Sequence, residues 1–498
     1  MKINKLFFLV ILAGVFACTD LKENLNDDLN FDQADEVLDA GILLSGAYSG
    51  MNGVYHGPGG MWGMNEHSSD EAIAPTRGGD WDDNGAWRAL CLKTWSPEHG
   101  EVNGAFNGLL GQIFSTTQVL TFGPTPQQEA EAKALRALHI FNATDLFGQV
   151  PFREPGEDLL QAPRVLTSEE AINLVISDTE AALPNLPDGP ATLANKDMAK
   201  VLLMKAYLNK GVYADRAAPK FDNGDLQKVI TLADEIINSG KYSLATNYFD
   251  NFAPNNNAIS TENIFTIENV AGSRSSIRNH WFMSLHYNQN PSGWNGFATL
   301  SDFYDSFEQD DARRQADYPV MTDVSGVKAG FGIGQQYDQN GTALLDRKGN
   351  PLIFTPEVKL VETGDNLEVT GIRVIKYPID YYHGDNADND LVIFRYADVL
   401  LMKAEALLRS GGNGLAIVNE LRAARNATDL TSLDLDEMLA ERGRELYWEG
   451  WRRQDLVRFG KYLNAWQEKP ATTAETLLFP IPSSALAVNP NLVQNPGY

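Results

Sequence analysis

The sequence predicts a mainly α-helical protein: a scaffold of stacked helix–turn–helix units that carries a large loop-rich region and a few short strands. An eight-residue pattern rich in alanine, leucine and methionine occurs twice, at 199–206 and 397–404. Each copy is apolar at helical spacing, and a second amphipathic segment follows it, at 225–239 and 414–425. Units of this size cannot bury their apolar faces alone, so they stack, and the tetratricopeptide repeat is the nearest pattern.

Length and charge limit both the architecture and the ligand. The chain has 498 residues, 43% of them hydrophobic, which allows a large core and, by length alone, two or three domains. Because the two repeat copies stand on either side of a long middle section, we expect one body over residues 31–498. The net charge of −26, from 66 acidic and 40 basic residues, opposes binding to nucleic acid and fits a neutral ligand.

The N-terminus has the pattern of a secretion signal. Residues 1–17 contain two lysines, a short apolar run and small residues, and Cys18 follows directly. This arrangement resembles a bacterial lipobox, in which the cysteine thiol is acylated; an ordinary signal with an incidental cysteine is the alternative. If Cys18 carries lipid, Cys91 is left without a disulfide partner. Residues 18–30 are polar and acidic, which predicts a flexible tether.

Helical periodicity accounts for most of the remaining chain. Helices are predicted at 31–48, 102–121, 127–146, 168–183 and 392–410. Residues 167–170 are typical of an N-terminal cap. Glycines that follow helical stretches, Gly148, Gly211 and Gly411, are expected to end them in the left-handed conformation. The helical scaffold is therefore assigned mainly to 31–50, 102–240 and 391–470.

Two stretches, 51–101 and 241–390, are rich in glycine and polar residues and are predicted to form a loop-rich ligand face. Outside the N-terminus no run of about 20 apolar residues occurs, so no membrane-spanning helix is expected. The proline-rich ending, 478–498, should be extended and lie against the body. Local patterns also predict short strands at 263–269 and 371–377 and a hairpin at 346–350.

The chain lacks the common catalytic and metal-binding motifs. It has no HExxH, CxxC, GxSxG or Walker loop, and no GxGxxG in a strand–turn–helix context. His67, Asp70 and Glu71 lie close in sequence, but we interpret them as loop polar groups bonded to backbone rather than as metal ligands. The acidic run 385–390 lacks two features of a calcium loop. With 66 acidic residues no carboxylate pair stands out for glycoside hydrolysis, so we predict no catalytic residue, metal or cofactor.

Tryptophans on polar, glycine-rich loops point to a ligand. A sugar ring exposes apolar C–H faces between hydroxyl groups, so an indole beside Asp, Asn or Arg matches both parts of its surface. The segments 67–87 and 276–297 have this composition. For any single tryptophan the alternative is a buried wedge between loop and scaffold. The predicted ligand-binding residues, with Trp81 and Trp294 foremost, are Trp62, Asn65, Asp70, Arg77, Asp80, Trp81, Asp82, Trp281, Asn288 and Trp294.

The segment 441–459 is dense in Glu, Asp and Arg, which invites a catalytic interpretation. Helical spacing favours a structural one, because Glu449 and Arg453 are four residues apart and could pair, while Leu446, Trp451 and Leu456 face inward. We therefore expect an ionic network that locks the last helices together. The remaining tryptophans assigned to helices in the core are Trp448, Trp451 and Trp466.

Together these motifs resemble the SusD/RagB family of nutrient-binding lipoproteins from the Bacteroidetes outer membrane. The similarity is carried by the lipobox at Cys18, by segments 146–151 and 395–407, by the block LAERGRELYWEGWRRQDLVRFG at 439–460, and by the ending at 479–498. The resemblance implies a tetratricopeptide-like scaffold, a lipid anchor at the cell surface, and a SusC-like TonB-dependent transporter as partner. It also implies that polysaccharide or oligosaccharide is bound without cleavage.

Three functions stay open on the sequence. We prefer a non-enzymatic glycan-binding lipoprotein exposed on the outer membrane. Peptide capture, as in RagB-like members, is the first alternative, and a surface glycoside hydrolase is the second. The negative charge favours a neutral glucan, fructan or xylan over anionic pectins or alginates, although a local arginine cluster could reverse that preference.

Overall fold

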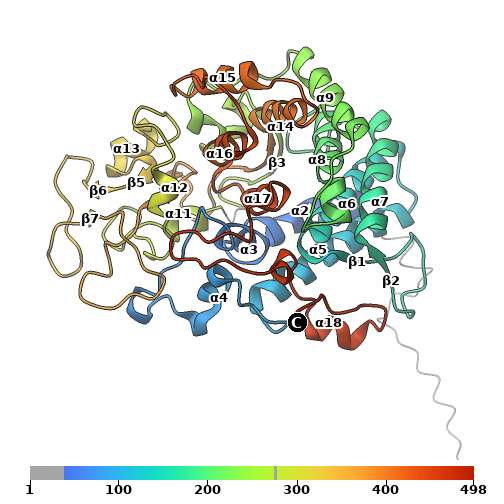
Figure 1. The fold of residues 1–498 in the computed structure, drawn as a ribbon, viewed down its shortest axis with the longest axis horizontal. Helices are drawn as coiled ribbons and strands as arrows, with labels where there is room; N and C mark the ends of the chain where they lie inside the picture. The colour runs from blue at the N-terminus through green and yellow to red at the C-terminus, as the bar shows by residue number, and fades with distance from the viewer. Residues whose placement is uncertain (1–38, 274–276) are drawn as a thin grey trace, which may run out of the picture.

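The computed structural model describes residues 39–273 and 277–498, and Figure 1 shows a helical part beside a loop-rich part. The predicted signal peptide, the tether, Cys18 and the first half of the helix predicted at 31–48 lie outside the described residues. In the described part, helices dominate and the strands are few and short. The predicted mainly α fold class is confirmed.

The scaffold helices pack against their neighbours along the chain. They are α2 (Ala40–Tyr55), α5 (Gly100–Thr121), α6 (Pro126–Phe147), α7 (Ser168–Ala182), α8 (Lys196–Ala214), α9 (Asn223–Asn238), α14 (Tyr396–Arg409), α15 (Leu415–Ala424), α16 (Leu435–Leu446) and α17 (Arg452–Arg458). Helix α5 packs between α2 and α6, α7 between α6 and α8, and α9 between α8 and α14. Helix α14 also contacts α15 and α16, so helices from opposite ends of the chain share one stack (Figure 1).

The two copies of the repeat occupy equivalent places. One copy lies in α8 and is followed by α9, and the other lies in α14 and is followed by α15. The leucines and methionines of both copies are buried, as their helical spacing predicts. Between the copies, the Lys205 ammonium lies 2.7 Å from the Asp398 carboxylate, and both side chains are buried. The repeat is therefore both a local pattern and a direct packing contact.

Glycines end some helices but not all those predicted. Gly148 and Gly411 have positive φ of 73° and 83°, as expected for left-handed caps. Gly211, however, lies inside α8, which continues to Ala214. A Cβ on Gly211 would lie 1.7 Å from the Lys220 carbonyl oxygen, so this glycine permits a close crossing of the chain. Likewise α2 runs past residue 48, where the predicted helix ends, and continues to Tyr55.

The N-terminal cap predicted at 167–170 is confirmed. The Thr167 hydroxyl accepts from the Glu170 N–H, and the Glu170 carboxylate accepts from the Thr167 N–H, which is a complete capping box. Helix α6 begins with the same device, built by Thr125 and Gln128. These caps satisfy backbone donors that the first turn of a helix leaves unpaired.

The described strands form small antiparallel sheets. Beside the scaffold helices, β1 (Gln149–Phe152) pairs with β2 (Arg164–Thr167). The other strands pair as β3 (Asn263–Ile267) with β9 (Leu391–Arg395), β5 (Ala329–Gly332) with both β4 (Gln315–Ala316) and β8 (Arg373–Ile375), and β6 (Gly334–Gln335) with β7 (Ile353–Phe354). The strands predicted at 263–269 and 371–377 are confirmed as β3 and β8. So is the hairpin at 346–350, where the Asp346 N–H donates to the Asn350 carbonyl at 2.7 Å.

Short helices connect these strands and cover the scaffold. They are α3 (Gly60–His67), α4 (Ala86–Leu92), α10 (Asn256–Ile259), α11 (Asn279–Phe282), α12 (Ser301–Tyr304), α13 (Pro319–Ser325) and α18 (Ser483–Val488). Helix α18 interrupts the ending that was expected to be wholly extended. The ending does lie against the body: the Phe479 N–H donates to the Leu146 carbonyl at 2.9 Å, and the Asn495 amide donates to the Phe147 carbonyl at 2.9 Å.

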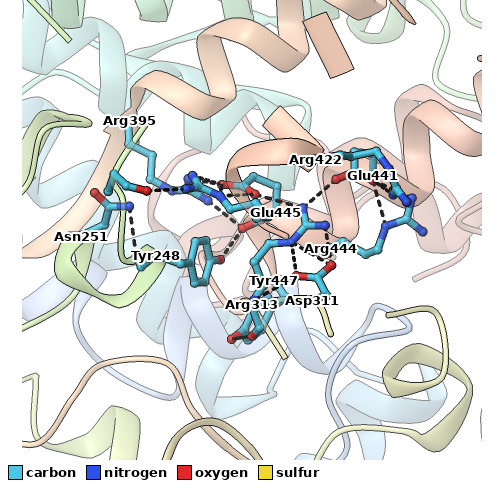
Figure 2. A network of polar contacts seen from close by, with 12 residues as sticks. Tyr248, Asn251, Asp311, Arg313, Arg395, Arg422, Glu441, Arg444, Glu445 and Tyr447 are labelled. Atoms are coloured by element: carbon cyan, nitrogen blue, oxygen red, sulfur yellow. Dashed lines mark hydrogen bonds and ion pairs between the residues drawn. The ribbon is translucent and has the colours of Figure 1, made fainter. Parts of the chain in front are cut away.

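A buried ionic network joins the last helices to the loop-rich part (Figure 2). At its centre, Glu445 of α16 lies 2.6 Å from Arg395 and 2.8 Å from Arg425. Arg313, from a loop after α12, lies 2.6 Å from Glu441 and 3.0 Å from Glu445. Burial alone would raise the pKa of Glu445, but the three arginines hold it well below its ordinary value. The predicted structural network is therefore confirmed.

The pair predicted within this segment is wrong. Trp448 has a φ of 58°, so the backbone leaves the helical conformation between α16 and α17 and the four-residue spacing is not a helical one. Arg453 instead lies 2.8 Å from Asp145 of α6, and Glu449 lies 2.8 Å from Arg395. Trp448 and Trp451 are buried as predicted, but both precede α17. Trp466 is half-buried in a loop.

Among the described residues, no helix is both long and apolar enough to cross a membrane.

Candidate ligand-binding surface

Two tryptophan side chains from two loops, Trp81 and Trp294, form what we call the aromatic platform, and Tyr287 lies in the same loop as Trp294. Trp294 is 42% exposed, which is unusual for so large an apolar side chain. Its ring stacks on Phe282 of α11, with centroids 5.7 Å apart and an interplanar angle of 24°. Its N–H donates to the Phe282 carbonyl at 2.7 Å, so both ring and backbone are supported from beneath. Trp294 is held in place while one part of its indole stays open to solvent.

Trp81 joins the two loops of the platform. Its indole Nε1–H donates to the Trp294 carbonyl at 2.8 Å. The side chain is half-buried, and its ring lies against Gly296, where an added Cβ would come within 2.4 Å of the indole. A glycine is therefore needed at 296 for Trp81 to approach this closely. The glycines of the Trp81 loop, Gly78 and Gly79, have positive φ and allow the tight turns that present the indole.

A polar rim surrounds the platform. The Arg347 guanidinium lies over the Tyr287 ring, 3.9 Å from its centroid. It also pairs with Glu368 at 2.5 Å and lies 3.8 Å from Asp80. Asn288 is exposed and donates to the Leu345 carbonyl at 2.8 Å, which ties the platform loop to the hairpin that carries Arg347.

The charges of the rim are set by these contacts. Burial alone would raise the pKa of Glu368, but hydrogen bonds from Arg347 and His286 hold it below its ordinary value. Burial lowers the pKa of His286 to about 4, so its contact with Glu368 at neutral pH is a hydrogen bond rather than an ion pair. The rim thus presents carboxylates, an amide and a guanidinium beside aromatic faces.

The structure brings together half of the residues predicted from sequence. Trp81 and Trp294 form the platform, Asp80 and Asn288 lie on its rim, and Asp82, half-buried, pairs with Arg88 in the Trp81 loop.

Four of the other predicted residues lie inside the protein. Trp62 and Trp281 are 4% and 1% exposed, and Asn65 and Arg77 are also buried. As the loops stand, these four side chains are out of reach of a surface ligand. Asp70 is half-buried and is held by Arg452, which donates to its carboxylate at 2.7 and 2.8 Å.

Arg77 nevertheless positions the platform. It donates to the carbonyls of Asn295 at 3.0 Å and Gly296 at 3.2 Å, next to Trp294, and to the Thr370 carbonyl at 2.8 Å. A single buried guanidinium therefore clamps the Trp81 loop, the Trp294 loop and the segment that carries Glu368. Arg77 was predicted to contact the ligand, but it holds the loops together instead. Local composition does not distinguish these two roles.

The structure also adds residues that the sequence analysis did not select. Tyr287 lay within the segment 276–297 and could have been found by the same aromatic criterion. Arg347 comes from the hairpin at 346–350 and Glu368 from a turn before β8, and nothing in their local sequence marks them.

The polar residues near α3 do not form a metal site. His67 is buried on α3, the Glu71 carboxylate accepts from the Trp448 N–H at 3.0 Å, and Asp70 pairs with Arg452. The expectation of backbone partners therefore holds for Glu71 but not for Asp70, whose partner is a side chain. In the part of the chain that the structure describes, no group of three His, Cys, Asp or Glu side chains could hold a metal ion.

Fold and surface define the class: an α-helical repeat scaffold that presents aromatic residues on loops. Comparison with known proteins agrees. The model of the SusD family matches residues 232–472. The starch-binding protein SusD of Bacteroides thetaiotaomicron is 27% identical over 515 aligned positions, covering 93% of this chain and 89% of that protein. The chain is therefore similar to the SusD family.

Solved structures show the same fold. A SusD superfamily protein from Parabacteroides distasonis superposes with a TM-score of 0.72 at 22% identity, covering 92% of this chain and 98% of that chain. A laminarin-binding SusD-like protein superposes with a TM-score of 0.69 at 24% identity, covering 92% of this chain and 99% of that one. At these identities the likeness establishes the fold alone.

Proposed function

We propose that the protein captures polysaccharide or oligosaccharide at the cell surface and passes it, without cleavage, to a SusC-like TonB-dependent transporter in the outer membrane. Acyl groups on Cys18 would hold it there. Similarity to the SusD family supports this assignment, and relatives named for starch and laminarin binding support glycan as the ligand class.

The observation that carries the proposal is the exposed face of Trp294 beside a polar rim. An indole supported by Phe282 and by Trp81 is pre-organised, so a ligand does not have to immobilise it. This surface offers stacking against the C–H face of a sugar, and it offers hydrogen bonds in which hydroxyl groups donate to Asp80 and accept from Arg347, with Asn288 able to do either. A neutral glucan, fructan or xylan backbone fits it, given the net charge of −26.

Substitution of Trp294 tests the proposal. Trp294→Ala should weaken binding to the polysaccharide that the protein retains, among starch, laminarin, inulin and xylan, by about tenfold to a hundredfold in calorimetric titration. Phe114→Ala is the matched control, because Phe114 is 43% exposed but lies on α5 in the scaffold. Equal affinity of the two variants would refute the platform.

The same samples separate the alternative functions. Release of new reducing ends from a bound polysaccharide would support a surface glycoside hydrolase. Binding of a peptide digest, with no retention on any polysaccharide gel, would support a RagB-like peptide receptor. Co-purification of a β-barrel transporter with the lipidated protein from outer membranes would support the proposed delivery step.

A further inference from the structure

A cavity of about 260 Å³ opens between the platform loop and the small strands β5 to β8. We call it the glutamine cavity, and its polar lining comes from Gln289, Gln315, Lys328, Gln335, Gln336 and Arg373. Leu285 and Gln289 belong to the loop that continues into Trp294, so this loop borders both the cavity and the platform. The volume lies below the range of about 300–1,000 Å³ for drug-sized ligands, which suits one sugar ring.

The charge of the lining is opposite to that of the protein. No aspartate or glutamate lines the cavity among the described residues, and two cations do. In a chain of net charge −26 such a lining is a local exception that would attract an anion.

The contacts of Arg373 indicate an anion-binding site more specifically than the charge of the lining does. Its side chain is 1% exposed, and its Nη atoms donate only to neutral oxygens: the Thr370 and Gly371 carbonyls at 2.7 Å, the Asn295 amide at 2.8 Å and the Glu368 carbonyl at 2.9 Å. Its Nε–H has no partner among the described residues. Burial and the neighbouring Arg77 lower the pKa of Arg373 well below its ordinary value. A buried guanidinium with a free N–H and no bonded carboxylate is a site that an anionic group would satisfy.

The glutamines supply acceptors for hydroxyl groups. The Gln315 amide nitrogen donates to the Phe331 carbonyl at 2.7 Å, and that of Gln335 donates to the Gln336 carbonyl at 2.8 Å and the Leu344 carbonyl at 3.0 Å. Because the amide N–H groups are engaged with the backbone, their carbonyl oxygens remain available to accept from a ligand. Phe354 and Tyr337 add aromatic surface to the same lining.

We infer that the glutamine cavity binds a uronic acid residue, with its carboxylate at the Arg373 and Lys328 side and its hydroxyl groups at the side-chain oxygens of Gln315 and Gln335. This inference rests on the proposed function for the choice of a sugar as ligand, and it deepens that proposal: the captured glycan would have a neutral backbone, bound on the platform, and acidic substituents.

Titration with monosaccharides tests the cavity directly. Sodium D-glucuronate and sodium D-galacturonate should bind in ligand-detected NMR titrations, at least one of them saturably, and D-glucose should bind about tenfold more weakly or not at all. Acetate should not compete at equal concentration. No saturable uronate binding, equal binding of glucose, or full competition by acetate would overturn the inference.

Variants assign the binding to the cavity. Lys328→Ala and Gln315→Leu should each weaken uronate binding several-fold. Lys359→Ala is the matched control: Lys328 pairs with Asp317 at 3.0 Å and Lys359 pairs with Glu468 at 2.7 Å, but only Lys328 lines the cavity. Arg373→Met should abolish uronate binding. Because this change also removes hydrogen bonds to four carbonyl or amide oxygens, thermal melts must show that the variant is folded. If it does not fold, uronate binding by Lys328→Ala is the deciding measurement.

Comparison of platform and cavity variants distinguishes a failure of this inference from a failure of the proposed function. Trp294→Ala should leave uronate binding unchanged, and Lys328→Ala should leave binding of an unsubstituted neutral polysaccharide unchanged. If Trp294→Ala retains full affinity for polysaccharide while Lys328→Ala loses uronate, the platform fails and the cavity stands. If uronate affinity is the same in Lys328→Ala, Gln315→Leu and the unaltered protein, the cavity fails whatever the platform does.

Discussion

The Trp81 indole donates a 2.8 Å hydrogen bond to the Trp294 carbonyl and thereby joins two loops that are 213 residues apart in sequence. Neither loop is part of a regular sheet, so this bond and the clamp by Arg77 set the geometry of the platform. A substitution of Trp81 should therefore lower the affinity for a ligand that contacts Trp294.

Trp81→Phe keeps a ring but removes the N–H donor. We expect affinity for the cognate polysaccharide to fall about fivefold, since one hydrogen bond is worth about 1 kcal/mol net. Trp87→Phe is the control, because Trp87 likewise loses an indole hydrogen bond, to Asp83 at 2.6 Å, but is buried beneath the platform. Calorimetric titration of both variants, beside thermal melts, measures the effect. A similar loss of affinity in Trp87→Phe would mean that loop stability, not the position of Trp294, controls binding.

Arg453→Ala should destabilise the fold strongly. It would leave Asp145 without its ion-pair partner at 2.8 Å and the Leu477 carbonyl without its donor at 2.7 Å, both in the interior. Breaking a buried pair in this way costs about 3–5 kcal/mol of unfolding free energy. Arg164→Ala, which removes an exposed pair with Glu154, should cost at most about 1 kcal/mol. Denaturant unfolding of both variants provides the comparison, and equal losses would contradict the structural role.

Gly211→Ala should also destabilise the protein, by about 1–3 kcal/mol, because the new methyl group would overlap the Lys220 carbonyl. The change lies within a helix, where alanine is otherwise the better residue. Gly53→Ala in α2 is the matched control, since no atom lies within 4 Å of its added Cβ, and it should raise stability by about 0.5–1 kcal/mol. Thermal melts that show stabilisation by both substitutions would disprove the close crossing at Gly211.

The contribution of the buried histidines to stability should fall on acidification between about pH 7 and 5, because these side chains resist protonation. Burial lowers the pKa of His139 to about 3 and those of His280 and His286 to about 4. Each stays neutral in the folded protein, while the unfolded chain takes up a proton near pH 6.5. The stability that each contributes is complete above the unfolded pKa and is lost as the pH falls toward the folded pKa.

Glu66 and Asp390 work in the opposite direction, since burial raises the pKa of each to about 7 and their contributions are lost as the pH rises toward that value. Burial also raises the pKa of Glu71. The test therefore isolates one histidine. His139→Gln should reduce the loss of unfolding free energy between about pH 7 and 5 by about 2 kcal/mol. Urea titrations at both pH values measure this difference, and an unchanged slope would show that His139 does not govern the acid response.

Cys18→Ala should release the protein from the membrane without affecting its folding, because Cys18 precedes the described body. Burial of acyl chains stabilises anchoring by about 0.8 kcal/mol for each methylene. Cys91→Ala changes the other cysteine, which is buried in the fold, and should leave membrane partitioning intact. Detergent-phase partitioning of the two variants decides; retention of Cys18→Ala in the membrane phase would exclude the lipid anchor at this position.

Some features follow from the sequence because their causes are local. The repeat at 199–206 and 397–404 predicted paired helices, since spacing alone determines which face of a helix is apolar. The cap at Thr167 and Glu170 and the hairpin at 346–350 depend on residues that are neighbours in sequence, and both are confirmed. The composition of the segments 67–87 and 276–297 located both loops of the platform.

Tertiary structure decided which of those loop residues face solvent. Trp62 and Trp294 stand in similarly glycine-rich surroundings, yet Trp62 is 4% exposed and Trp294 is 42% exposed, because Trp448 and Phe297 pack onto the first. Arg347 and Glu368 lie on the rim, and Arg373 lines the cavity. The segments that carry these residues have no sequence pattern that predicts a binding site. Burial and charge pairing depend on what distant parts of the chain bring to a position, and one-dimensional spacing does not contain that information.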